Sequence, residues 1–206
     1  MESWLSVLKN ILCLAEPLLV LPETQWVIVG SAATALQGAD VVPGDIDILA
    51  QKPVGVFKFA ELMAPYMPQH IAVSPDHDGW RSSKEQPVSE GPDEFGFYWT
   101  FARWFVDDVK VEVAHIEGPD AVDVLQSGGG IWEAGPEMWP HICHVSFQGY
   151  QVPVVPLEIQ LETCLQRGLE KRADAILNVF QREGYEAALL ERALRREHLE
   201  WFKQQS

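Results

Sequence analysis

The segment that most constrains this chain is Asp45-Ile46-Asp47-Ile48-Leu49, which follows a Pro-Gly turn. Side chains of a strand alternate between its two faces, so the two carboxylates point one way and the isoleucines point into a core. Like charges side by side on one face repel each other, and a divalent cation would neutralise them. The segment therefore predicts a strand that carries a metal-binding pair.

The chain just before this pair predicts a strand, a turn and a short helix. Trp26-Val27-Ile28-Val29 is apolar, with the β-branched and aromatic residues that favour a buried strand. Gly30-Ser31 follows, then small residues as far as Gln37, and Gly38 lies where such a helix would stop. Gly30 would let the backbone approach a phosphate, and Ser31 would offer an N–H and a hydroxyl at a helix start.

A third carboxylate lies in a later alternating segment. Phe97 to Val106 is rich in aromatic and β-branched residues, and Val109 to Ile116 alternates with Glu112 between valines. Between them Asp107-Asp108 predicts a tight turn, so we interpret these two residues as turn formers and not as ligands. The sequence thus predicts a β-hairpin whose second strand carries Glu112.

The order of these pieces resembles the polymerase-beta-type nucleotidyltransferase superfamily, in particular its small-molecule branch, which includes the aminoglycoside and lincosamide nucleotidyltransferases. The resemblance covers about residues 25–116. It implies that Gly30 and Ser31 contact the nucleotide phosphates. It also implies that Asp45, Asp47 and Glu112 are the catalytic carboxylates and hold magnesium, with two ions expected.

The sequence departs from the family pattern just before the Asp-x-Asp pair. The family commonly has an Arg or Lys and then a Ser or Thr there, whereas this chain reads Val41-Val42-Pro43-Gly44. The cation that approaches the triphosphate would then come from elsewhere. The candidates are Arg81, Lys84, Arg167 and Lys171.

The rest of the chain predicts the surroundings of the site. We expect an α/β (α+β) protein with a mixed β-sheet flanked by helices, a nucleotidyltransferase-like catalytic domain over residues 1–155 and a C-terminal helical element over 156–206. The further elements that we expect are an amphipathic helix over 3–19 that Pro17 ends or kinks, a helix over 56–63, a strand over 71–73, an irregular segment over 74–96, a helix over 121–126, a strand or hairpin over 145–155, helical spacing over 157–180 and a helix over 185–201.

The charge of the chain argues against a nucleic-acid partner. Residues 1–155 carry 7 Lys and Arg against 21 Asp and Glu, while residues 156–206 carry 8 against 9. Nucleic-acid binding rests on basic side chains that neutralise phosphates, so the acidic part would repel a nucleic acid. The same field would favour a cationic small substrate, although an acidic surface also simply aids solubility.

Three other kinds of site are disfavoured. The G-x-G-x-x-G fingerprint of dinucleotide-binding folds is absent, because Ala32 and Ala33 stand where later glycines would be. The His141-Ile142-Cys143-His144 segment lacks a second Cys/His pair for zinc. The glycine run 128–130 has no following Lys-Ser/Thr, so it predicts a loop.

The function expected from the sequence is a nucleotidyltransferase that moves an NMP, with AMP expected, from a nucleoside triphosphate to a hydroxyl of a small molecule or a protein. The alternative is a non-catalytic protein of the same fold that acts as a binding or regulatory, antitoxin-like partner. Three scattered cysteines favour reduced thiols in a cytoplasm, and no apolar run approaches the roughly 20 residues that span a bilayer. The oligomeric state stays open.

Overall fold

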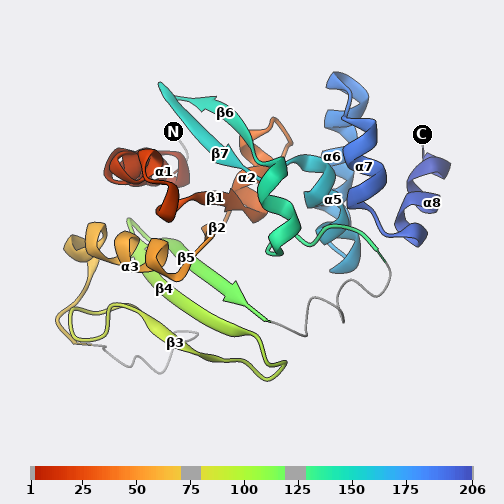
Figure 1. Cartoon of the computed structure of the whole chain (residues 1–206). Helices are drawn as coiled ribbons and strands as arrows, with labels where there is room; N and C mark the ends of the chain where they lie inside the picture. The colour runs from red at the N-terminus through yellow and green to blue at the C-terminus, as the bar shows by residue number, and fades with distance from the viewer. Residues whose placement is uncertain (1–2, 71–79, 119–128, 206) are drawn as a thin grey trace. The chain divides into compact units, whose positions relative to one another are not determined.

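The computed structural model describes residues 3–70, 80–118 and 129–205 (Figure 1). The chain forms two compact units, residues 1–27 with 44–118 and residues 28–43 with 119–206. The seven strands of the described residues form a mixed sheet in the order β3-β4-β5-β2-β1-β7-β6. The predicted α/β class with a mixed sheet and flanking helices is therefore confirmed.

The first unit is built on four strands and two longer helices. Its elements are α1 (Ser3–Ala15), the 3-10 helices η1 (Glu16–Val20) and η2 (Pro22–Thr24), β2 (Asp45–Ala50), α3 (Pro53–Leu62), the 3-10 helix η3 (Ala64–Tyr66), β3 (Ser89–Pro92), β4 (Tyr98–Val106) and β5 (Val109–Glu117). Strand β2 pairs parallel with β5, and β5 and β3 pair antiparallel with β4.

The two faces of this sheet differ in character. Helices α1 and α3 pack against strands of one face, where alternate side chains are fully buried. The residues that form this core layer include Ile46, Ile48, Ala102, Trp104, Val111 and Val113. The intervening residues of the same strands, including Asp45, Asp47 and Glu112, are only partly buried. One face thus holds the core and leaves the other available for polar side chains.

The β4–β5 hairpin turns on two residues in the left-handed region. Asp107 has φ 47° and Asp108 has φ 63°. Positive φ at both central residues belongs to a type I′ turn, whose twist matches that of the strands it joins, and Asp tolerates this conformation better than most residues. The predicted role of these two residues as turn formers is confirmed. The turn sets a register in which Val106 pairs with Val109 and Arg103 with Glu112.

The second unit combines a short strand ladder with a helical cluster. Its elements are the second half of β1 (Trp26–Val29), then α2 (Gly30–Leu36), the 3-10 helix η4 (Pro136–His141), β6 (Cys143–Phe147), β7 (Tyr150–Val154), α5 (Leu157–Gln166), α6 (Glu170–Glu183), α7 (Ala187–Ala193) and α8 (Arg196–Gln205). Strand β7 pairs parallel with β1 and antiparallel with β6. Helix α5 contacts α2, α6 and α7.

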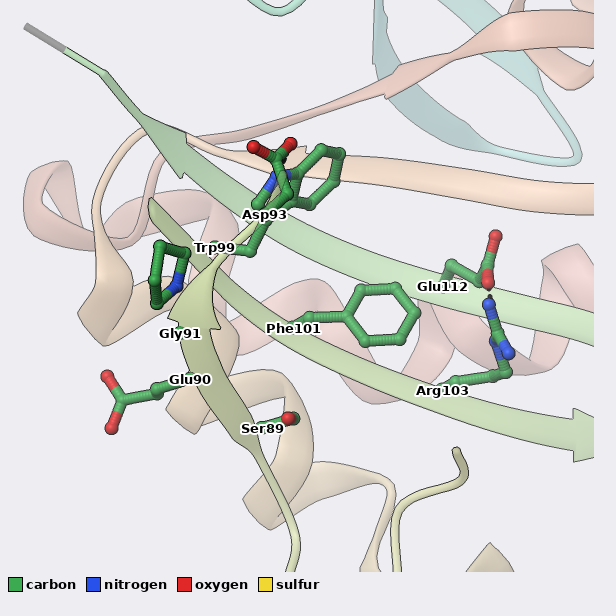
Figure 2. A pocket seen from close by; sticks show the side chains of 9 residues that line it. Ser89, Glu90, Gly91, Asp93, Trp99, Phe101, Arg103 and Glu112 are labelled. Carbon is green, nitrogen blue, oxygen red and sulfur yellow. Dashed lines mark hydrogen bonds and ion pairs between the residues drawn. The ribbon is translucent and has the colours of Figure 1, made fainter. Parts of the chain in front are cut away.

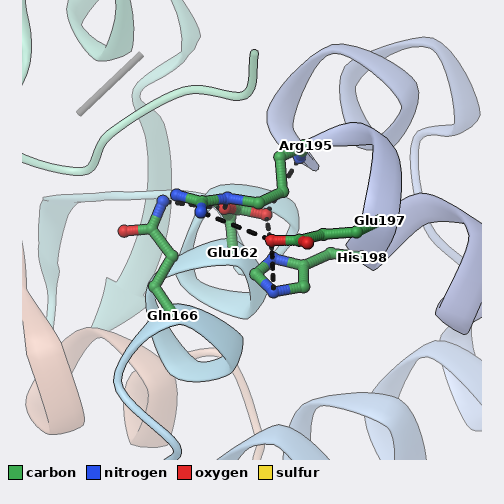
Figure 3. Close-up of polar contacts among 5 residues, drawn as sticks. All are labelled: Glu162, Gln166, Arg195, Glu197 and His198. Carbon is green, nitrogen blue, oxygen red and sulfur yellow. Dashed lines mark hydrogen bonds and ion pairs between the residues drawn. The ribbon is translucent and has the colours of Figure 1, made fainter. Parts of the chain in front are cut away.

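A buried carboxylate ties the last helices of this unit to α5 (Figure 3). Glu162 is only 1% exposed, and Arg195 binds it twice, with Nε 2.8 Å from Oε1 and the backbone N 3.0 Å from Oε2. Gln166 Nε2 lies 2.8 Å from Oε1, and His198 Nδ1 lies 2.8 Å from Oε2. We call these four residues the Glu162 cluster. The single helix predicted over 185–201 is wrong, because the chain forms two helices there, α7 and α8. The break lies at Arg195, whose backbone N–H donates to Glu162 and not to a carbonyl of the preceding helical turn.

The helix predicted over 3–19 is α-helical to Ala15 and continues as the 3-10 helix η1, because Pro17 has no N–H for an α-helical bond. The predicted ending or kinking of this helix by Pro17 is confirmed, whereas the prediction for residues 74–96 needs correction. The irregular segment predicted over 74–96 contains strand β3, which pairs with β4 through backbone atoms and carries Gly91 and Pro92. Sequence propensity disfavours both residues in strands, so pairing at a sheet edge prevailed over local preference.

The predicted strand over 71–73 and helix over 121–126 lie outside the described residues. The domain boundary predicted between residues 155 and 156 stays a prediction. None of the described helices has the length and apolar character needed to cross a lipid bilayer.

Candidate functional site

The carboxylates predicted as metal ligands lie together in the first unit. In the β2–β5 ladder Asp47 pairs with Glu112 and Asp45 with Lys110, so the side chains of all four share one face of the sheet. Each of Asp45, Asp47 and Glu112 offers an oxygen, and these three atoms lie within 4.8 Å of one another. We call these three residues the carboxylate triad. The spatial grouping that the sequence predicted is therefore present.

The surroundings of Asp47 in the triad disfavour the ionised form of its carboxyl group. Burial, followed by the negative charges of Asp45 and Glu112, raises the pKa of Asp47 to about 7. A carboxylate that would normally be ionised near pH 4 thus keeps its proton close to neutrality. Titratable groups whose pKa values are strongly shifted are common at functional sites, and they also occur in structural ion-pair networks.

Two basic side chains share the face with the triad. Lys110 Nζ lies 3.1 Å from Asp45 Oδ2 and 3.1 Å from Glu112 Oε2, and Arg103 Nε lies 2.5 Å from Glu112 Oε1. Burial opposes the ionisation of Glu112, but the Lys110 hydrogen bond and the Arg103 charge outweigh it and hold the pKa of Glu112 below its usual value. Glu112 therefore stays ionised while Asp47 holds a proton.

A pocket of about 640 Å³ opens beside Glu112 (Figure 2). The rings of Trp99 and Phe101 line it, and the Arg103 guanidinium lies 5.1 Å from the centre of the Phe101 ring. The Arg103–Glu112 ion pair lies at one end of the pocket, and at the other Asp93 accepts a hydrogen bond from Trp99 Nε1 at 2.9 Å. The pocket thus offers flat apolar walls between two polar ends.

The two cations predicted in the irregular segment occupy different surroundings. The Arg81 guanidinium lies over the Phe105 ring at 4.2 Å from its centre, and Phe105 pairs with Lys110 in the β4–β5 ladder. Lys84 is exposed, and its backbone N–H donates to the Pro68 carbonyl. Arg81 thus lies on the face of the sheet that carries the triad, while the predicted role of both residues toward a triphosphate stays a prediction.

The remaining predicted residues lie in the second unit. Gly30 begins α2 with φ 64°, a conformation that glycine adopts without strain, and Ser31 beside it is 8% exposed. Lys171 is an exposed residue of α6. Their phosphate-binding roles stay predictions.

A buried acid that the sequence did not reveal supports the start of α2. The Glu133 side chain accepts a hydrogen bond from the Gly30 N–H and another from Gln160 Nε2 at 2.7 Å. Burial raises the pKa of Glu133, although Arg167 and Arg172 pull it down. The backbone N–H of Gly30 is therefore bound to a carboxylate of the same unit, while the predicted role of the Ser31 N–H toward a phosphate stays a prediction.

The basic side chains beside the triad were also missed. Lys110 stands two residues before Glu112 in an alternating strand, so parity alone puts both on one face. A two-residue turn at 107–108 pairs Arg103 with Glu112. The signals were present, and they required the pairing register to be read as well as the alternation.

The donor set of the triad fits a magnesium ion. All three donors are carboxylate oxygens, which magnesium prefers, and ligands on opposite sides of one ion lie about 4.2 Å apart. The three oxygens lie within 4.8 Å of one another, so a small movement of the side chains would bring them to the spacing of one ion. Asp45, Asp47 and Glu112 are thus able to hold the ion.

No family model matches the sequence, and no curated protein matches it. Solved structures do match. A Thermotoga maritima protein described as a "putative nucleotidyltransferase" aligns with a TM-score of 0.55 at 20% identity, covering 88% of this chain and 94% of its own. A solution structure of the antibiotic-resistance factor ANT(2'')-Ia aligns with a TM-score of 0.44 at 11% identity, covering 92% of this chain and 88% of its own. The first similarity establishes a nucleotidyltransferase-like fold.

Proposed function

We propose that this chain is a magnesium-dependent nucleotidyltransferase that moves an NMP, with AMP expected, from a nucleoside triphosphate to a hydroxyl group. The observation that carries the proposal is the carboxylate triad, with its oxygens within 4.8 Å of one another on one face of a sheet of nucleotidyltransferase-like fold. Mutual repulsion of the three acids raises the free energy of this arrangement, and a bound divalent cation would offset it.

The chain's own residues have separate roles in this proposal. Asp45 and Asp47 hold the metal from β2, and Glu112 holds it from β5. Glu112 is ionised, so it is available both as a ligand and as an acceptor for the proton of the attacking hydroxyl. Magnesium bound there would stabilise the charge of the transferring phosphoryl group and of the leaving pyrophosphate.

The pocket beside Glu112 supports the choice of a small acceptor. It borders a triad carboxylate directly, so a molecule in it would present a hydroxyl to the metal-binding side chains. The Trp99 and Phe101 rings would pack against an apolar or flat part, and Asp93 would attract a cationic group. An amine-bearing molecule such as an aminoglycoside meets this description, and so does an exposed side chain of a protein.

One observation favours a non-catalytic alternative. Lys110 and Arg103 already neutralise part of the triad, and the segment Val41-Val42-Pro43-Gly44 supplies no cation before the Asp-x-Asp pair. A chain that had lost catalysis would keep such internal ion pairs for stability and use its acidic surface to bind a regulatory partner, as an antitoxin does.

Calorimetric titration with ATP and GTP, each with and without magnesium, tests the proposal on the wild-type protein and on Asp47→Ala. Nucleotide binding that requires magnesium and is lost in the variant supports the transferase, and candidate acceptors can then be screened by pyrophosphate release. Absence of binding under every condition removes the enzymatic function and leaves the binding partner as the remaining candidate.

A further inference from the structure

Lys110 lies where a cation bound to the triad would lie. Its ammonium nitrogen is 3.1 Å from Asp45 Oδ2 and 3.1 Å from Glu112 Oε2, so it joins two of the three proposed ligands. The strand register holds it there, because Lys110 pairs directly with Asp45 and stands two residues from Glu112 on the same face. A metal ion and this ammonium group therefore compete for the same oxygens.

The other base of the site is held differently. Arg103 binds the second oxygen of Glu112, and its guanidinium also lies over the Phe101 ring. A guanidinium in a stacked, hydrogen-bonded position loses more contacts when it moves than an ammonium on a flexible four-carbon chain. Of the two bases, Lys110 is the one that can leave the carboxylates readily.

Charge balance gives the same answer. The triad with Lys110 and Arg103 has one net negative charge when every group is ionised. One divalent ion added to all five groups would make the site positive, whereas one ion in place of the Lys110 ammonium would make it neutral. Partly buried sites tolerate net charge poorly, so the exchange is favoured over the addition.

We infer that Lys110 is an internal counter-ion of the carboxylate triad, which a divalent cation must displace in order to bind. The inference rests on the proposed function, because it concerns the metal site of that function. Its consequence is a weaker affinity for free metal ions than the three carboxylates would have without the lysine. Lys110 makes two partly exposed ion pairs with the triad, so the loss of affinity is roughly tenfold.

Manganese titration, followed through the electron paramagnetic resonance signal of the free ion, tests this inference. The titration compares the wild-type protein with Lys110→Met and Lys110→Gln at pH 8, where Asp47 is ionised. Both variants should bind manganese roughly tenfold more tightly than the wild type. The glutamine variant keeps a hydrogen-bond donor beside the carboxylates, so it serves if the methionine variant folds poorly.

Lys58→Met is the matched control, because Lys58 forms an exposed ion pair with Glu61 in the same unit. It removes one positive charge without touching the triad, so its manganese affinity should equal that of the wild type. Equal tightening in this control would attribute the effect to net charge and would overturn the inference. Lys110→Arg keeps the charge and should bind no more tightly than the wild type.

Acetylation of lysines in the wild-type protein, read by mass spectrometry, supplies a readout of the lysine itself. Magnesium should speed the labelling of Lys110, because the displaced ammonium loses its two carboxylate partners, while Lys58 labels at an unchanged rate. Metal binding with no change at Lys110 would overturn the inference.

The two proposals fail in different ways. If manganese binds equally tightly to the wild type and to both Lys110 variants, the counter-ion role of Lys110 is wrong and the proposed metal site still stands. No binding by the wild type or by any variant removes the metal site, and with it the proposed function.

Discussion

The carboxylate triad and the Glu162 cluster both place acids in partly or fully buried positions, yet they treat those acids in opposite ways. Glu162 is 1% exposed and receives four hydrogen bonds from Arg195, Gln166 and His198. Asp47 lies close to the carboxylates of Asp45 and Glu112, and burial together with their charges raises its pKa to about 7. Glu162 is thus surrounded by hydrogen-bond donors, whereas Asp47 faces two other carboxylates.

The difference separates a structural acid from a functional one. A buried carboxylate with a full set of donors stabilises the fold and has no capacity left for a ligand. A carboxylate that faces like charges costs stability and gains a favourable partner only when a cation binds. Strain of this kind at one site, compensated elsewhere in the fold, is typical of sites that bind or react.

The largest expected effect comes from Asp47→Asn, which removes one triad charge without changing shape. Nucleotidyl transfer, measured as pyrophosphate release, should fall by about 10²–10³-fold or more, because a charge-stabilising group of the transition state is lost. The thermal midpoint at pH 8 should not fall, since a repelling charge has gone. A large loss of thermal stability would mean that Asp47 stabilises the fold as Glu162 does, and would contradict the difference proposed between the two acids.

Glu162→Gln should do the reverse. It leaves Arg195 and His198 without their buried charged partner and with only the exposed Glu197, and breaking a buried pair in this way costs about 3 kcal/mol in the free energy of unfolding. Urea denaturation measures the loss, and magnesium-dependent nucleotide binding should persist. The control is Glu197→Gln, because Glu197 also pairs with Arg195 but its side chain is 70% exposed. This variant should change the free energy of unfolding by less than about 0.5 kcal/mol.

The raised pKa of Asp47 predicts a dependence of stability on pH. The folded chain keeps this proton up to about pH 7, whereas the unfolded chain releases it near the ordinary value of 3.8. The folded state therefore holds more protons between these limits, so its free energy of unfolding falls as pH rises from about 4 to 7.

The difference between wild type and Asp47→Asn isolates this contribution from the other titrating groups. The wild type should lose about 2 kcal/mol relative to the variant across that window, a value reduced from the full shift because Asp47 is partly exposed. Urea denaturation at pH 4.5 and pH 7.5 measures it. If the difference in unfolding free energy between the two proteins were the same at both pH values, Asp47 would ionise with an ordinary pKa, and the proposed effect of its neighbours would be wrong.

The smallest effect is expected from Glu133→Gln, which sharpens the comparison with a third buried acid. Its pKa is raised by burial, but it accepts hydrogen bonds from the Gly30 N–H and from Gln160. A neutral amide keeps one acceptor and loses the other, so the variant should lose about 1 kcal/mol of unfolding free energy. A loss as large as that of Glu162→Gln would place Glu133 with the charged structural acids.

The first unit shows what the sequence could predict. Alternation at 45–49 and 109–113 assigned both faces of β2 and β5, because residues with a period of two reveal a half-buried strand directly. The pairing of Asp47 with Glu112 is a long-range register, and here the family resemblance supplied what local pattern could not. A single lysine on a strand, such as Lys110, carries no local signal of its role, because that role depends on its neighbours across the sheet.

The second unit shows where prediction from sequence stops. Helical spacing in the last fifty residues identified helices, but not the break between α7 and α8, which depends on Glu162 capturing the Arg195 N–H from 33 positions away. Glu133 stands in a segment with no regular pattern, and its contact with Gly30 joins distant parts of the chain. Such contacts arise from tertiary packing and leave no local signal.

The division of the chain into units bears on its synthesis. Residues 28–43 belong to the second unit, whose other residues follow position 118. A ribosome would therefore deliver every strand of the first unit while the segment that contains α2 still lacks β7, α5 and α6, its partners in the ladder and the helical cluster. The small apolar side chains of α2 would therefore gain their packing partners only after the last third of the protein had emerged.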